Sequence, residues 1–192
     1  MKTILQDLIT LTGFCPQDLE ILHQMGPHIV EWVPAMVDVL SDLVSEFAPP
    51  LSSGNVKPSD QENILKNWLS EIIHGRFDLS FWKHQWLLQL SRPEQRFHNH
   101  ILLIAIVSRL QTFFLAQCLR EFELPVAKRL YLAFKRLTDT MCGMVIEGVF
   151  EMYLNAAETS TGIKRSVLAK MVSTSAEKLI KKEYQKLMSQ ST

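Results

Sequence analysis

Cysteine is scarce in this 192-residue sequence, which contains only Cys15, Cys118 and Cys142 at widely separated positions. An odd number of cysteines without a C-x-x-C pair argues against a disulfide framework and against a zinc ribbon. We interpret the three as buried or half-buried thiols in a reducing compartment, which predicts a cytoplasmic protein. Net charge is also missing, because 20 Lys and Arg balance 20 Asp and Glu. A neutral chain gives no support to general nucleic-acid binding.

Long apolar runs, targeting segments and catalytic motifs are missing as well. The longest apolar run, Ile101–Val107, has seven residues, far fewer than the ~20 that span a bilayer, and the N-terminus does not resemble a secretory signal. The sequence contains no G-x-G-x-x-G, P-loop, H-E-x-x-H or G-x-S-x-G motif. Asp38 and Asp42 lie four residues apart, but a solvated helix face is the simpler interpretation of that spacing. We therefore expect neither an enzyme nor a transmembrane segment.

Apolar residues at helical spacing fill most of the chain, which is 47% hydrophobic. Because alternating strand patterns are nearly absent, the sequence predicts an all-α protein. Pro34 predicts a kink or a fresh helix start near Trp32. The clearest loop covers residues 48–60, with three Pro, one Gly and three Ser. Ahead of the C-terminal tail, the predicted helices cover residues 4–11, 16–25, 28–47, 60–74, 79–91, 94–122 and 125–158.

The zero net charge divides unevenly along the chain. Residues 163–192 hold seven Lys or Arg and two Glu, a sum of +5, whereas residues 1–162 hold 13 Lys or Arg and 18 Asp or Glu, a sum of −5. The apolar spacing from Ile163 to Leu187 predicts a basic amphipathic helix outside the main domain. We place the boundary between residues 1–160 and 161–192. The tail has three open roles: a signalling helix toward a protein partner or output module, a surface for an anionic partner or membrane, or a dimer-capping helix.

Four segments together resemble the protoglobin and globin-coupled sensor family. "TGFCPQDLEILHQMGPHI" (12–29) and the following "AMVDVLSDLV" (35–44) are similar to the opening of these domains. "NWLSEIIHGRFDLSFWKHQWLLQLSRPEQRFHNHILLIAIVSRL" (67–110) resembles their central block, in which a Trp-containing helix ends at a Gly and a short and a long helix follow. "LTDTMCGMVIEGVFEMYLNA" (137–156) resembles their terminal helix. The resemblance covers roughly residues 10–157.

The resemblance implies a globin-like helical sandwich that forms a homodimer through its last two long helices, here residues 94–122 and 125–158. It also implies haem binding and gas sensing, with the signal passed to a C-terminal output module.

Two positions depart from the family's pattern. The proximal His position falls at Arg92 or Pro93, and neither side chain offers a lone pair to iron. The distal Tyr position falls at Val39 or Leu40, which cannot donate a hydrogen bond to bound oxygen. These departures favour a sensory globin without ordinary haem chemistry. They leave open whether haem or another ligand is bound.

Two histidines are the candidate replacement ligands if haem is bound. His98 lies closest to the missing ligand and enters the pocket after a register slip of one turn, and His84 lies on the short helix itself. The alternative is that both are ordinary polar residues, and we identify no firm metal ligand. We expect the pocket to be lined by large apolar side chains, namely Leu40, Trp68, Trp82, Trp86 and Phe97.

The sequence therefore predicts a globin-fold sensory domain. We expect a ligand to change how the helices pack around its pocket, and we expect this structural change to be transmitted through residues 94–158 to the tail. The alternative is a haem-binding oxygen sensor or carrier that uses a non-standard ligand such as His98.

Overall fold

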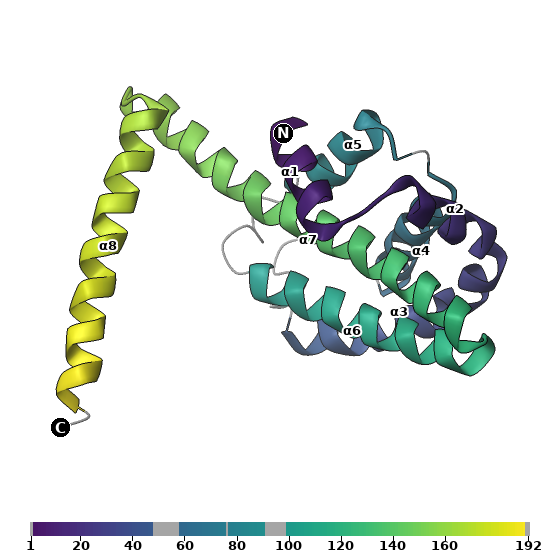
Figure 1. Ribbon diagram of the computed structural model, residues 1–192. Coiled ribbons are helices and arrows are strands. Elements are labelled where there is room, and N and C mark those ends of the chain that lie inside the picture. The colour runs from purple at the N-terminus through teal and green to yellow at the C-terminus, as the bar shows by residue number, and fades with distance from the viewer. Residues whose placement is uncertain (1, 48–57, 76, 91–98, 191–192) are drawn as a thin grey trace. The chain divides into compact units, whose positions relative to one another are not determined.

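A computed structural model describes residues 2–47, 58–75, 77–90 and 99–190, and these residues form eight helices without a strand (Figure 1). The predicted all-α class is confirmed. The helices are α1 (Lys2–Thr12), α2 (Pro16–Gln24), α3 (Gly26–Phe47), α4 (Pro58–His74), α5 (Leu79–Leu90), α6 (Asn99–Glu121), α7 (Leu124–Thr161) and α8 (Arg165–Gln190).

Of the two alternatives predicted at Pro34, a kink or a fresh helix start, the structure shows no fresh start, because α3 runs through Pro34 as one helix. Proline has no N–H, so the carbonyl of Val30 four residues earlier loses its helical partner. Both Pro34 and Val30 lie on the exposed side of the helix, where a carbonyl without a helical partner can bond to solvent. The opposite side holds Trp32 and Met36 in the core, and their burial keeps the helix continuous.

Close contacts divide the chain into two units, residues 1–146 and 147–192. Helix α7 belongs to both, because it begins in the first unit and ends in the second at Thr161. The predicted boundary near residue 160 coincides with the end of this helix, whereas the division by contacts comes earlier.

The core of the first unit lies where α3, α4, α6 and α7 meet. Helix α3 packs most extensively on α4 and α6. The rings of Phe114 and Phe134 stack with centroids 3.9 Å apart, and the Trp32 indole meets Phe114 edge-on at 5.3 Å. Burying each such side chain contributes roughly 1.5–3 kcal/mol. These aromatic contacts join α3, α6 and α7.

Two further contacts fix the N-terminal helices against α7. Helix α1 crosses α7 so closely that a Cβ added at Gly143 would lie 2.6 Å from a methyl carbon of Leu8. The buried Asp18 carboxylate of α2 accepts a hydrogen bond from the backbone N–H of Cys15 at 3.0 Å, which caps the helix. The same carboxylate pairs with Arg136 of α7 at 3.2 Å. Helix α7 is therefore held along its length within the first unit.

In the second unit, the described side chains of α8 are exposed except those of Arg165 and Leu168, which are half-buried. Its six Lys or Arg and two Glu give a net charge of +4. At about 100° per residue, Met171 and Ile180 lie on opposite sides of the helix axis, and Val167 and Tyr184 lie about 100° apart; all four side chains are exposed. The exposed apolar side chains of α8, which also include Val172, Leu179 and Met188, therefore spread around the helix axis.

Candidate functional site

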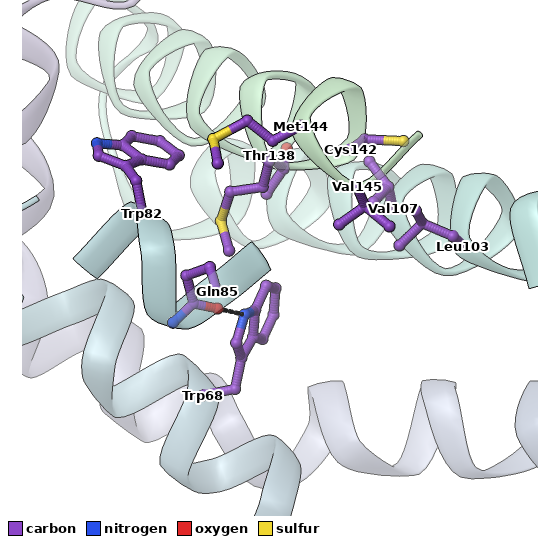
Figure 2. Close-up of a pocket in the computed structure, with 10 residues that line it drawn as sticks. Trp68, Trp82, Gln85, Leu103, Val107, Thr138, Cys142, Met144 and Val145 are labelled. Carbon is purple, nitrogen blue, oxygen red and sulfur yellow. Dashed lines mark hydrogen bonds between the residues drawn. The ribbon is translucent and has the colours of Figure 1, made fainter. Parts of the chain in front are cut away.

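A small cavity lies between α4, α5, α6 and α7 in the first unit (Figure 2). Helix α7 supplies half of the lining residues. The helix that forms much of the cavity wall therefore also continues into the second unit. The full lining consists of Trp68, Trp82, Gln85, Leu103, Val107, Thr138, Met141, Cys142, Met144 and Val145.

Trp82 fills one side of the cavity and is only 2% exposed. Its indole N–H donates a hydrogen bond to the carbonyl of Phe77 at 3.0 Å, and its ring meets Phe14 and Phe81 edge-on. Phe77 has a φ of 51°, a left-handed conformation that costs a residue with a side chain roughly 1–2 kcal/mol. The aromatic cluster around Phe77 offsets that cost. Asp78 caps the start of α5 by accepting backbone N–H groups at 2.9 and 3.0 Å.

Gln85 forms the polar part of the cavity wall and is 4% exposed. Its carbonyl oxygen accepts the indole N–H of Trp68 at 3.0 Å, drawn as the dashed line in Figure 2. Its amide N–H₂ donates to the carboxylate of Glu71 at 2.8 Å. Because a buried amide is costly unless both of its ends are paired, this chain fixes the orientation of α5 against α4.

A second polar cluster fixes α6 against α7. The Gln111 amide donates to the Thr138 hydroxyl at 2.9 Å and to the Asp139 carboxylate at 2.7 Å. Lys135, one turn earlier on α7, forms an ion pair with Asp139. These bonds position Thr138 at the cavity and hold the two long helices in register.

The cavity has a volume of about 30 Å³, which is room for about one water molecule. Sites for small molecules and cofactors occupy roughly 300–1,000 Å³, so the cavity between the described side chains is smaller than an ordinary cofactor site. Burial raises the pKa of the Cys142 thiol, and Asp139 raises it further. No group of three or more His, Cys, Asp and Glu able to hold a metal occurs among the described residues.

Of the predicted site residues, Trp68 and Trp82 line the cavity. Leu40 is buried on α3 but is not among the lining residues. His84 is exposed on α5 and does not line the cavity. The remaining predicted positions lie outside the part of the chain that the structure describes, either entirely or at their side chains: Arg92, Pro93, Phe97 and His98 entirely, and Trp86 at its side chain.

Sequence reasoning missed Gln85 and the side chains of α7. Gln85 lies three residues after Trp82 and so shares its helix face, and the Trp68 indole needs an acceptor. The helical spacing from Trp82 and the need of the Trp68 indole N–H for an acceptor together were sufficient to predict Gln85 from the sequence. Thr138 and Met141 had no comparable signal, because their inward position depends on how α7 is rotated against α6.

The sequence profile of the protoglobin family matches residues 1–151. The chain belongs to the protoglobin family. No curated protein matches the chain. The protoglobin match includes all of the cavity-lining residues and ends on α7, so α8 lies beyond it.

Helix α6 of this protoglobin domain is unusually apolar for its degree of burial. Residues Ile101–Glu121 are long and apolar enough to cross a membrane by length and composition. Helix α6 also contributes Leu110 and Phe114 to the domain core, as a central helix does. Ile101 is 81% exposed, and Ile104 next to it borders an open groove of about 230 Å³ between α6 and α7.

Proposed function

We propose that this protoglobin domain is a sensory module that works without ordinary haem chemistry and passes the state of its pocket along α7. One observation supports the proposal most strongly: the cavity is nearly filled, and half of its lining residues belong to the helix that continues into the second unit. A change in the packing of the cavity therefore acts directly on the helix that leaves the domain.

The side chains around the cavity suit such a change. Met141 and Met144 project from α7 toward the cavity, and methionine adapts its three rotatable bonds to different neighbours. Trp82 faces them from α5. A ligand that binds two packings of these side chains with affinities differing by a few kcal/mol shifts the balance between them. The consequence is a displacement of α7 relative to α5.

We propose further that the domain forms a homodimer through α6 and α7. The exposed Ile101 and Ile104 and the adjoining groove make an apolar surface on these helices. A second copy covers such a surface in a self-complementary way, because a twofold axis brings the same patch to both sides. We place the dimer in the cytoplasm, with α8 facing a protein partner.

Amide hydrogen exchange of residues 147–161 tests the transmission step. Trp82→Ala removes a buried indole that lines the cavity, and Trp32→Ala removes an equally buried indole that does not. Each indole also donates one hydrogen bond at 3.0 Å, so the two variants are matched in burial and polarity. We expect Trp82→Ala to change exchange in residues 147–161 and Trp32→Ala to leave it near the wild-type rate.

Equal effects of the two variants would mean that α7 responds to general loss of stability and not to the pocket. No effect of either variant would contradict transmission along α7.

A further inference from the structure

The turn between α7 and α8 begins with a glycine cap. Gly162 follows the last residue of α7 and has a φ of +69°, and its N–H donates to the carbonyl of Glu158 at 2.9 Å. This is the αL capping pattern in which glycine is preferred. A Cβ added at Gly162 would meet nothing within 4 Å, so the backbone angle alone calls for glycine here.

The start of α8 is capped by a side chain of the preceding helix. The carbonyl of Lys164 accepts the first helical bonds, from Val167 at 2.9 Å and Leu168 at 3.1 Å, which makes Lys164 the N-cap residue. A lysine side chain cannot accept a hydrogen bond. The Glu158 carboxylate serves as the capping acceptor instead, because it accepts a hydrogen bond from the backbone N–H of Arg165 at 3.1 Å. Its negative charge also meets the positive end of the helix.

An ion pair joins the two helices across the turn. The Arg165 guanidinium donates to the Glu151 carboxylate, and this hydrogen bond is the main reason that the pKa of Glu151 lies below its usual value. In one straight helix, at about 1.5 Å per residue, Glu151 and Arg165 would stand roughly 21 Å apart. Glu158 and Arg165 would stand roughly 10 Å apart in the same helix. Both contacts therefore exist only while the chain turns back at Gly162.

We propose that residues 158–165 form a two-state joint, in which α7 and α8 are either folded back on these contacts or joined as one continuous helix. The contacts that hold the folded-back state are weak enough to release, because Arg165 is 40% and Glu151 25% exposed at the side chain. The straight state is open to this sequence, since the segment contains no proline and Gly162 is its weakest helix former. This inference goes beyond the proposed function, because it concerns the second unit alone.

Distances between spin labels on the two helices distinguish the states. Asn155→Cys and Lys182→Cys introduce exposed labelling sites on α7 and α8. One continuous helix separates these positions by about 40 Å, and the folded-back state gives a shorter distance. Cys15→Ser and Cys142→Ser remove the half-buried thiols, whereas the buried Cys118 does not react. Dilution with unlabelled chain removes distances between copies.

Two variants should shift the equilibrium from the folded-back state toward the straight state. Arg165→Glu breaks the ion pair and places a second negative charge beside Glu158, and Gly162→Ala strains the turn while favouring helix. We expect Gly162→Ala to raise the ratio of straight to folded-back chains by roughly tenfold or more, and Arg165→Glu to raise it by several-fold. Lys178→Glu makes the same charge change on α8 without an observed contact at the turn, and Gly162→Asn keeps a residue that tolerates the left-handed angle. Both controls should keep the short distance.

Wild-type distances in both Arg165→Glu and Gly162→Ala would overturn the two-state joint. So would a broad distribution without a component near 40 Å, because that result describes a loose linker and not a second helical state. Circular dichroism of each variant shows that helix content is retained.

Discussion

Replacing Trp82 with alanine probes the packing of the cavity most sharply. The indole is 2% exposed, so its removal leaves a void on the order of 100–150 Å³, the size of engineered cavities that stay dry and bind benzene. At about 24 cal/mol per Å³ the void alone costs roughly 3 kcal/mol. Loss of the hydrogen bond to the Phe77 carbonyl adds about 1 kcal/mol. We expect Trp82→Ala to lower the free energy of unfolding by about 4 kcal/mol, which corresponds to a melting temperature about 10 °C lower.

Urea unfolding of the wild type, Trp82→Ala and Trp82→Phe measures this loss. The phenylalanine variant keeps most of the volume and should lose less than half as much free energy as the alanine variant. Benzene or indole added to Trp82→Ala should raise its midpoint, because a ligand that binds only the folded state stabilises it. A loss below 1 kcal/mol, together with no response to either ligand, would refute a well-packed cavity at this position.

Three further predictions concern individual contacts. Arg136→Ala leaves the buried Asp18 carboxylate without its cation, and because Arg136 is partly exposed we expect urea unfolding to show a loss of about 1–2 kcal/mol, with a smaller loss for Arg136→Lys. Gln85→Ala leaves the Trp68 indole N–H without its acceptor and should cost about 1–3 kcal/mol by the same assay; an unchanged midpoint would argue against the hydrogen-bonded chain. Burial raises the pKa of Cys118 from 9.0 to about 12, so native protein at pH 9 should protect this thiol from iodoacetamide until it unfolds. Because the unfolded state deprotonates first, Cys118 makes unfolding easier as pH rises from 9 toward 12, and fast alkylation of the native protein would contradict its burial.

Most helices were predictable from the sequence because the burial pattern of each follows its own 3.6-residue period. Helix α3 shows where this local reasoning leaves alternatives open. Pro34 predicts either a kink or a fresh start, and the helix continues without a fresh start because Trp32 and Met36 on the other side are buried against neighbouring helices. The free energy gained by burying these side chains against neighbouring helices exceeds the cost of one proline on the exposed face.

The candidate site was predictable in part, and α5 illustrates why. Trp82 and His84 are two residues apart, which places them about 200° apart around a helix. Burial of Trp82 therefore directs His84 to the solvent, and this relation was already present in the sequence. The α7 side of the cavity was not predictable in the same way. Apolar residues cover much of that helix, so which of them face the cavity follows only from its packing against α6.

An absorption spectrum of the purified protein, expressed with haem supplied, tests the central claim most directly. The nearly filled cavity of about 30 Å³ predicts a protein without a Soret band. A Soret band at one haem per chain that disappears in His98→Ala would contradict the account and favour a haem-based sensor with a non-standard ligand.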